Sequence, residues 1–306
     1  MSSSKQKAQS GGSAGGQVNI QTVTVVQNVS TDPDGQCLQQ VKNILQASHN
    51  ITIHVVPVDN KTDHPEVPKE AANPDLVIVL GGDGTFLRAS QCFVEQKIPL
   101  VGINTGTLGF LTRIESDKIE SYLSRLLAGE YRIEERMMLA VSLETQPQTL
   151  LVAANDVVVK NRNPSQMCSL NLFINDVLVS TYDADGIIIA TPTGTTAYTL
   201  SAGGPVISPE VEAISITPIC PHSLSAKPIV IPAGKTLRVE SAVKNRPVVY
   251  SVDGQESGTL EPGQNLTLFR APYPLKMIDF GQEGEDFYLL LKQKLHWAMN
   301  PRWKTQ

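Results

Sequence analysis

A short apolar run ends in three glycines that surround one carboxylate, in the string Val-Leu-Gly-Gly-Asp-Gly-Thr at residues 79–85. Glycines at the end of a buried strand let the backbone approach a ligand closely, and the N–H groups of the turn and of a following helix start can hold an anion. A carboxylate repels phosphate, so Asp83 is better suited to act as a base or as a ligand of Mg²⁺. The sequence therefore predicts phosphate chemistry around Asp83.

A second glycine-containing turn follows the next apolar run of the chain. The string Asn104-Thr-Gly-Thr-Leu-Gly-Phe-Leu111 comes directly after Pro99–Ile103, which suits a buried strand. Ligand sites in open α/β sheets lie where the carboxyl ends of strands meet, so this turn and the Asp83 loop are candidates for one cleft. An ordinary β-turn that leads Phe110 and Leu111 into the core fits the residues equally well.

Two strings in the second half of the chain are suited to a nucleotide. Asn155 and Asp156 precede the run Val157–Val159 and can bind two ribose hydroxyls or an adenine amine, although Asn and Asp also favour ordinary turns. Residues 185–205 run from a buried strand into a turn rich in Thr, Gly and Pro. The hydroxyl and N–H groups of this turn suit ribose and phosphate, and Tyr198 offers a flat face for a base.

The secondary-structure elements that must position these strings change in type along the chain. Residues 1–17 are rich in Ser, Gly, Gln, Ala and Lys, which predicts a disordered tail. Strand-like and helix-like segments alternate over residues 18–130, which predicts an α/β domain with a mainly parallel sheet. Short β-branched runs separated by Gly, Pro and Asn occupy residues 131–275 and predict an all-β domain. In the last segment, residues 276–306, apolar spacing predicts an amphipathic helix over Asp286–Trp297.

Length, charge and cysteine content limit the class of protein. The 306 residues are enough for one large or two ordinary domains. A formal net charge of −5 gives no overall basic field, so nucleic acid is not an expected partner. No apolar stretch is long enough to span a bilayer, so no membrane association is expected. The four cysteines are far apart and show no metal-ligand spacing, which predicts a reducing, cytoplasmic location and no metal site built from the protein.

Taken in order, these motifs resemble the NAD kinase family. The similarity extends over residues 76–255 and is carried by Gly81-Gly-Asp-Gly84, Asn104–Phe110, Asn155-Asp156, Asp185–Tyr198 and Thr217–Ser225. The resemblance implies an N-terminal α/β domain with a Rossmann-like parallel sheet, an all-β sandwich-like C-terminal domain, and a C-terminal helix that returns to the first domain. It also implies transfer of the γ-phosphate of ATP, accompanied by Mg²⁺ or another divalent cation, to the adenosine-ribose 2′-hydroxyl of NAD, which gives NADP.

The resemblance also assigns roles to individual residues. Asp83 is expected to be the general base that accepts the 2′-hydroxyl proton, with Gly84 beside it against the dinucleotide. An alcohol is a poor nucleophile, so positioning is expected to supply much of the acceleration. The other expected contacts to the dinucleotide or to phosphate are Arg88, Asn155, Asp156, Asp185, Thr196, Ala197, Tyr198, Thr199, Leu200, Ser201 and Gln255. An ordinary solvent-facing charge is the alternative for Arg88. A homodimer or homotetramer is expected by the same resemblance.

Two positions depart from the family pattern. Asp156 stands where many members have Glu, and Asp183 stands where many have a basic residue or Gln near the substrate. The first change shortens the side chain by one methylene, and the second removes a favourable contact. The preference between NAD and NADH therefore stays open, and no residue decides between ATP and polyphosphate as the phosphate donor.

Three other functions share parts of this pattern. A Gly-Gly-Asp-Gly turn also occurs in diacylglycerol-type lipid kinases and in phosphofructokinases, so the loop alone leaves a lipid or a sugar phosphate as the acceptor. A non-catalytic dinucleotide sensor would keep the fold and the pocket without turnover. The string Thr191–Tyr198 argues against both other kinases, and the intact Asp83 argues against the sensor.

Overall fold

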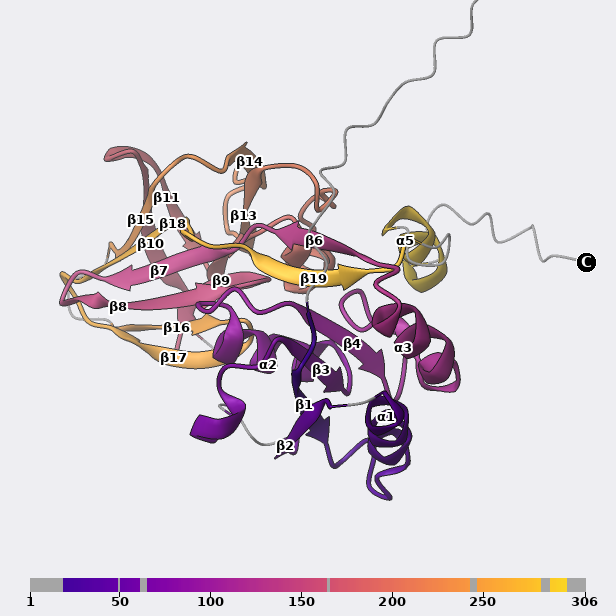
Figure 1. The fold of residues 1–306 in the computed structure, drawn as a ribbon. Coiled ribbons are helices and arrows are strands. Elements are labelled where there is room, and N and C mark those ends of the chain that lie inside the picture. The colour runs from indigo at the N-terminus through magenta and orange to yellow at the C-terminus, as the bar shows by residue number, and fades with distance from the viewer. Residues whose placement is uncertain are drawn as a thin grey trace, which may run out of the picture.

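The computed structural model describes residues 19–48, 50–60, 65–163, 166–242, 247–281 and 287–295. The predicted tail, residues 1–17, and both ends of the predicted helix Asp286–Trp297 lie outside the described residues. The described chain forms two regions, one in which helices cover a sheet and one that is built almost wholly of strands (Figure 1).

The N-terminal region is built on a mainly parallel sheet with the strand order β2-β1-β3-β4-β19-β6. In chain order, its strands are β1 (Thr22–Asn28), β2 (Thr52–Val58), β3 (Leu76–Leu80), β4 (Leu100–Asn104), β6 (Arg132–Arg136) and β19 (Leu275–Asp279), with the short β5 (Ile114–Glu115) beside β4. Along this order only the β19–β6 pair is antiparallel among the described strands. The central strands β3 and β4 are buried along their whole length, as expected for a sheet covered on both faces.

Helices cover both faces of this sheet. Helices α1 (Gln36–Ala47) and α3 (Ile119–Leu127) pack on one face, and α2 (Asp83–Phe93) packs on the other (Figure 1). Gly35, before α1, has no side chain to cap the helix, and the buried Asp32 does so instead by accepting two N–H groups of the first turn. Short 3₁₀ helices complete the connections, namely η1 (Lys69–Ala71) and η2 (Ser116–Lys118).

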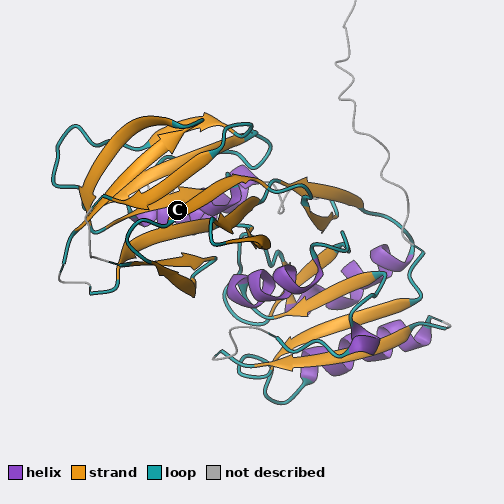
Figure 2. Cartoon of the chain, turned by 90° about the vertical axis from the view of Figure 1, so that its left-hand side faces the viewer, coloured by secondary structure: helices purple, strands orange, loops and turns teal. Residues whose placement is uncertain are grey.

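The second region is built mostly of strands (Figure 2). Its described residues form two antiparallel sheets with the orders β11-β10-β15-β18-β7-β8 and β14-β13-β12-β9-β16-β17. The strands are β7 (Leu139–Leu143), β8 (Gln146–Ala153), β9 (Asp156–Asn161), β10 (Cys168–Ile174), β11 (Val177–Ala184), β12 (Gly186–Ala190), β13 (Ala213–Ile219), β14 (Ile229–Pro232), β15 (Leu237–Ser241), β16 (Val248–Val252), β17 (Gln255–Leu260) and β18 (Asn265–Arg270). Apolar side chains of both sheets, such as Leu170, Ile187 and Leu268, share one core, which is the packing of a β-sandwich. The turn after β12 contains η3 (Thr193–Thr196) and the short α4 (Tyr198–Ser201).

Helix α2 joins the two regions. Its fully buried Phe86 and Phe93 belong to a cluster that also contains Met138, Ala140 and Val152 from the β-sandwich side. Burying an aromatic side chain of this size contributes about 1.5–3 kcal/mol. The loop that carries Asp83 is therefore attached to a helix whose position depends on both regions.

The C-terminal helix α5 (Phe287–Leu295) lies against the N-terminal region, as predicted. The ring centroids of Phe287 and Phe110 are 6.4 Å apart, and Nζ of Lys294 lies 5.0 Å from the Phe110 ring centroid. Helix α5 therefore covers the turn after β4, which is the turn that the sequence analysis considered as part of a ligand cleft.

Several strands lack the β-branched alternation that indicates a strand in the sequence. Strand β6 reads Arg-Ile-Glu-Glu-Arg and β17 reads Gln-Glu-Ser-Gly-Thr-Leu, and both form because a neighbouring strand offers hydrogen-bond partners. Strand β6 lies beyond residue 130, and yet it pairs within the first sheet together with β19. The domain limits at residues 130 and 275 stay predictions.

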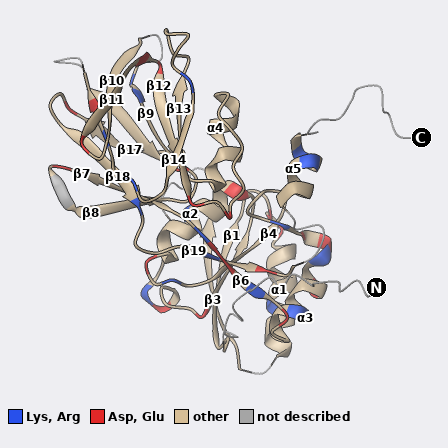
Figure 3. Ribbon diagram, turned by 90° about the horizontal axis from the view of Figure 1, so that it is seen from above, with Lys and Arg blue, Asp and Glu red and all other residues tan. Residues whose placement is uncertain are grey.

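Charged residues of both signs are interspersed along the ribbon of the two regions (Figure 3). Lys292 and Lys294 form a small basic group in the last turn of α5. No helix in the described parts of the chain combines the length and the apolar character that a membrane span requires.

Candidate functional site

Asp83 is the first residue of α2, and its carboxylate is held by the turn after β4. Its Oδ2 accepts the N–H of Phe110 at 2.8 Å, and its Oδ1 accepts the N–H groups of Leu111 and Thr112 at 3.0 Å each. The Thr112 hydroxyl donates to the same Oδ1 at 3.1 Å. The structure thus brings the two glycine-containing turns together at the carboxyl ends of β3 and β4.

Gly109 makes this close approach possible. A Cβ atom at Gly109 would lie only 1.8 Å from Oδ1 of Asp83, so no larger residue fits without displacing the carboxylate. The turn itself is braced by Asn104, whose Nδ2 donates to the carbonyl oxygen of Thr107 at 2.6 Å and whose Oδ1 accepts the N–H of Gly106 at 2.7 Å. The carboxylate therefore lies in a preformed cradle of backbone donors.

The start of α2 leaves room and donors for an anion. A Cβ atom at Gly82 or Gly84 would meet nothing within 4 Å, so the backbone is open at both positions. One turn further along, Nη2 of Arg88 donates to Oγ1 of Thr85 at 3.4 Å. The buried Nε of Arg88 has no hydrogen-bond partner among the residues that the structure describes. N–H groups at a helix start and a guanidinium are both suited to phosphate.

A second carboxylate gathers backbone N–H groups at the turn between β8 and β9. Oδ1 of Asp253 accepts the N–H of Asn155 at 2.7 Å and that of Asp156 at 3.1 Å, while its Oδ2 accepts the N–H of Ala154 at 2.9 Å. Asp253 and Gly254 have left-handed backbones, with φ of 49° and 81°, in the two-residue turn between β16 and β17. This Asp-Gly turn thereby fixes the segment that carries Asn155 and Asp156.

Asp156 and Asp253 form a pair of neighbouring carboxyl groups. Burial raises the pKa of Asp156 to about 7, and the charge of Asp253 adds to this shift. Burial also raises the pKa of Asp253, to about 6, although its three backbone N–H donors favour the charged form. These N–H groups stabilise the charged form of Asp253. The proton shared by the pair therefore resides mainly on Asp156.

The turn after β12 is anchored on the same segment. Oγ1 of Thr191 donates to the carbonyl oxygen of Ala154 at 2.5 Å, and the Thr191 N–H donates to that of Asn155 at 2.9 Å. A Cβ atom at Gly194 would lie 2.1 Å from the Asn155 oxygen, so only glycine lets the turn lie this close. The buried hydroxyl of Thr195 is likewise bonded to backbone groups. Buried hydroxyls that were expected to serve ribose and phosphate therefore hold the turn itself in shape.

The Asn155 segment, the Asp253 turn and the turn after β12 line one cavity of about 310 Å³. Four of the predicted binding residues, Asn155, Asp156, Ala197 and Tyr198, contribute to its wall, together with Asp253. Tyr198 is 43% exposed, so its ring is available to a ligand. The cavity thus combines a flat aromatic face with amide and carboxyl groups, as a nucleotide site requires.

The other residues of the predicted stretch Thr196–Ser201 differ in exposure. Ser201 is exposed, Thr199 is fully buried, and Thr196, Ala197 and Leu200 are half-buried. The Thr196 hydroxyl donates to the carbonyl oxygen of Thr193 at 3.2 Å. In the described structure, Tyr198 and Ser201 are therefore the most accessible side chains of the stretch.

Two predicted residues lie away from the Asn155 end of this cavity. The exposed Asp185 precedes Gly186, which pairs with Lys160 of β9, and Lys160 lines the same cavity. At about 3.3 Å per residue, Lys160 lies roughly 16 Å along the strand from Asn155. Gln255 lines a separate cavity of about 200 Å³ between α2 and the strands β8, β16 and β17.

Sequence reasoning missed the carboxylate that fixes the Asn155 turn and the cations near the Asp83 turn. The Asp-Gly dipeptide between two β-branched runs indicates a tight hairpin, which was a usable signal for the backbone of Asp253. Nothing in the spacing indicates that its carboxylate reaches residues 154–156. Arg113, Glu134 and Arg136 form ion pairs beside the Asp83 turn, and no motif marks them in the sequence.

Comparison with known proteins bears on the same two regions. A model of the ATP-NAD kinase N-terminal domain matches residues 22–131, and a model of the ATP-NAD kinase C-terminal domain matches residues 154–280. The chain belongs to the ATP-NAD kinase family. Among its relatives, an NAD kinase of Symbiobacterium thermophilum is 44% identical over 72% of this chain and 78% of the relative. An NAD kinase of Heliobacterium modesticaldum is 40% identical over 76% of this chain and 82% of the relative.

Solved structures of the ATP-NAD kinase family show the same fold. A yeast NADH kinase in complex with NADH superposes with a TM-score of 0.82 at 24% identity, covering 94% of this chain and 90% of that one. An NAD kinase from Archaeoglobus fulgidus in complex with ATP gives a TM-score of 0.70 at 26% identity, covering 89% and 98%. The α/β region, the β-sandwich and the C-terminal helix are thus confirmed as the family architecture.

The activity of the chain is that of an NAD kinase, a phosphotransferase that converts NAD to NADP with ATP. The comparisons give no support to a lipid kinase, a phosphofructokinase-like kinase or a non-catalytic sensor.

Proposed function

We propose that Asp83 is the general base of this NAD kinase reaction. The observation that carries the proposal is the cradle around its carboxylate, which fixes Oδ1 by three hydrogen bonds and leaves Oδ2 with one. As the 2′-oxygen of the adenosine ribose bonds to the γ-phosphorus of ATP, the bond from that phosphorus to the leaving ADP oxygen breaks. The hydroxyl proton passes to Oδ2 of Asp83, which has room for a second hydrogen bond.

The dinucleotide is proposed to lie along the 310 Å³ cavity. Asn155 and Asp156 bind its ribose or adenine, Tyr198 stacks on the base, and the remainder of Thr196–Ser201 lines the adenosine half. Asp185 contacts a polar group at the far end, beyond Lys160. The cavity wall supports these roles for Asn155, Asp156, Ala197 and Tyr198, while the role of Gln255 rests on the family resemblance.

Gly84 is proposed to contact the dinucleotide, because a Cβ atom there would meet nothing within 4 Å. The phosphates of ATP are proposed to bind at the start of α2, where Arg88 has an unpaired Nε among the described residues. A divalent cation would neutralise phosphate charge there. Among the described residues, no three His, Cys, Asp or Glu side chains are grouped so as to hold a metal ion. The phosphate oxygens of ATP are hard ligands of the kind that Mg²⁺ prefers, and Asp83 is the acidic residue in the first turn of α2.

The substitution Asp83→Asn tests the base directly. Loss of a general base slows catalysis by about 100- to 10,000-fold, so NADP formation should fall within that range while calorimetry still detects NAD binding. The exposed Asp34→Asn makes the same chemical change away from the site and should keep normal turnover. Near-normal activity of Asp83→Asn would remove Asp83 from this role. Assays of NAD and NADH against ATP and polyphosphate would show whether the enzyme also uses NADH and polyphosphate.

A homodimer or homotetramer is proposed as well. Support comes from the edge strand β11, on which Val177, Leu178 and Val179 are exposed, because an open apolar edge is suited to a second chain. Light scattering on the purified protein would test it, and a monomeric mass would contradict it. The cytoplasmic location stays a prediction.

A further inference from the structure

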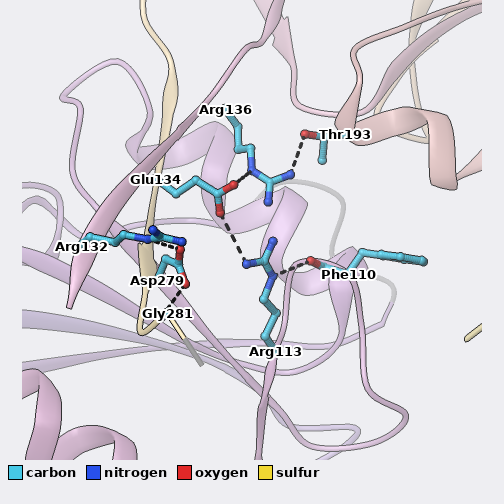
Figure 4. A network of polar contacts seen from close by, with 8 residues as sticks. All are labelled: Phe110, Arg113, Arg132, Glu134, Arg136, Thr193, Asp279 and Gly281. Carbon is cyan, nitrogen blue, oxygen red and sulfur yellow. Dashed lines mark hydrogen bonds and ion pairs between the residues drawn. The ribbon is translucent and has the colours of Figure 1, made fainter. Parts of the chain in front are cut away.

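A line of polar contacts leads from the Asp83 cradle into the ion pairs beside it. The N–H of Phe110 donates to Oδ2 of Asp83, and the carbonyl oxygen of the same Phe110 accepts a hydrogen bond from Nε of Arg113 at 3.2 Å. Nη1 of Arg113 lies 3.5 Å from Oε2 of Glu134 on strand β6 (Figure 4). Phe110, whose N–H binds Oδ2 of the proposed base, is therefore also bound by Arg113 through its carbonyl oxygen.

The same line continues into the β-sandwich. Oε1 of Glu134 lies 2.7 Å from Nε of Arg136, and Nη1 of Arg136 donates to Oγ1 of Thr193 at 3.4 Å (Figure 4). Glu134 and Arg136 lie two residues apart on β6, so their side chains share one face of the strand. Thr193 belongs to the turn that rests against Asn155 at the cavity. One network thus connects the Asp83 cradle with the turn that carries Tyr198.

The network is largely shielded from water and contains two positive side chains and one negative side chain. Arg136 is 3% exposed, and the Arg113 and Glu134 side chains are 10% and 24% exposed. Burial lowers the pKa of the Arg136 guanidinium, and the charge of Glu134 opposes that shift. Buried ion pairs are weak sources of stability, because desolvation offsets their attraction. Such pairs can still position the groups that they join, and Glu134 contacts Arg113 through Oε2 and Arg136 through Oε1.

We propose that Arg113, Glu134 and Arg136 form a positioning network that holds the Asp83 cradle and the Thr193 turn at a fixed distance from each other. The network acts through Phe110 and Thr193 and touches no substrate. The proposal rests on the proposed role of Asp83 as the base. Asn155 in the cavity wall is held by Asp253 and Thr191, which lie outside the network. Damage to the network should therefore lower kcat and leave KM for NAD nearly unchanged.

The test measures kcat and KM for NAD with purified full-length enzyme, ATP and Mg²⁺. Glu134→Gln removes the charge that joins both arginines, and we expect kcat to fall about 10-fold or more with KM within about twofold, because small misplacements of reacting groups cost up to about 100-fold. Glu240→Gln is the matched control. It makes the same chemical change in an ion pair on strand β15 of the β-sandwich, where Oε2 of Glu240 lies 2.9 Å from Nη1 of Arg238.

A milder pair of variants keeps the test decisive if Glu134→Gln does not fold. Thr193→Val removes the hydroxyl that accepts from Arg136 at constant size, and Thr193→Ser keeps it. We expect the valine variant to lower kcat by about threefold or more and the serine variant to restore it, since only the hydroxyl differs in function. A valine variant with the kcat of the wild type would overturn the proposal, as would a Glu134→Gln variant with normal kcat or with only a raised KM.

The two proposals fail in different ways. If Asp83→Asn keeps normal turnover, the base assignment fails whatever the network variants show. If Asp83→Asn is inactive while Glu134→Gln has normal turnover, the base stands and the positioning network fails. The double variant completes the test, because a network that acts through Asp83 should add little to the loss in Asp83→Asn.

Discussion

Asp83 and Asp253 gather backbone N–H groups in the same way in two different regions of the molecule. Asp83 binds those of residues 110–112 from the start of a helix in the α/β region, and Asp253 binds those of residues 154–156 from a hairpin turn in the β-sandwich. The two differ in their neighbours. A hydroxyl and a helix N-terminus lie beside Asp83, whereas a second carboxyl group, Asp156, lies beside Asp253.

This difference suits Asp83 to its proposed role as the base and Asp253 to the support of a neighbouring segment. All three donors of Asp253 come from the segment that lines the cavity, so its carboxylate fixes Asn155 and Asp156. The donors of Asp83 come from a turn outside that cavity wall, and they fix the carboxylate itself. Changes near Asp83 should therefore act on turnover, and changes near Asp253 should act on stability and on NAD binding.

The substitution Gly109→Ala should give the largest effect. Its Cβ would lie 1.8 Å from Oδ1 of Asp83, so the carboxylate must move. A displacement of this kind lowers kcat by about 100-fold when it misplaces a reacting group. Gly106→Ala is a matched control in the same turn, because a Cβ there meets nothing within 4 Å. Equal kcat values for the two variants, measured as NADP formation, would contradict the cradle as the determinant of Asp83 geometry.

Asp253→Asn should lower stability and weaken NAD binding. An amide offers one acceptor oxygen and places an NH₂ group against backbone donors, so at least one buried N–H loses its partner. We expect a loss of about 2 kcal/mol in unfolding free energy by urea titration, since bonds to charged groups contribute about that much. KM for NAD should rise as well. The exposed Asp176→Asn, at another left-handed turn position, is the control and should leave both values unchanged.

Asp156→Asn should change the pH dependence of stability, which is the smallest of the three effects. The folded state binds a proton at Asp156 up to about pH 7, whereas a free Asp releases it near pH 3.8. The raised pKa of Asp156 therefore stabilises the folded state fully below pH 3.8, and this stabilisation is lost as the pH rises through 7. Asp253 and Lys160 line the same cavity and set the local charge.

The Asn variant carries no titrating group at this position. Thermal melts at pH 5 and pH 8 should show that the wild type loses more Tm between these values than the variant does. A larger loss in the variant would contradict the assignment of the proton to Asp156.

Much of the fold could be predicted because its signals are local. The apolar runs Leu76–Leu80, Gly186–Ala190 and Val248–Val252 coincide with strands of the structure. Strands such as β6 and β17 could not be predicted, since their polar residues become strands only when a neighbouring strand is present. The joining of β19 to β4 and β6 brings residues 275–279 next to residues far earlier in the chain, and no local pattern encodes that pairing.

The site could be predicted in part for the same reason. Three glycine-containing strings marked the positions of the Asp83 loop, the turn after β4 and the turn after β12, and the Asn155-Asp156 pair marked the Asn155 segment. Their use of side chains was not predictable: buried hydroxyls of the last turn bind backbone groups, and Gln255 lies in a different cavity from Tyr198. Whether a hydroxyl faces a ligand or its own backbone depends on burial, which is set by packing.

The sequence by itself determined the type of chemistry and the two-part architecture. Three patterns can be recognised from the order of the residues alone. They are the glycines around a carboxylate, the turn crowded with hydroxyls, and the change near residue 130 from alternating strands and helices to strands. Only the tertiary structure decided which groups act on one another. The cradle of Asp83, the Asp156–Asp253 pair and the line from Arg113 to Thr193 join residues 27 to 97 positions apart. Such contacts depend on the packing of both regions around α2, because hydrogen bonds and ion pairs require distances that only the folded chain fixes.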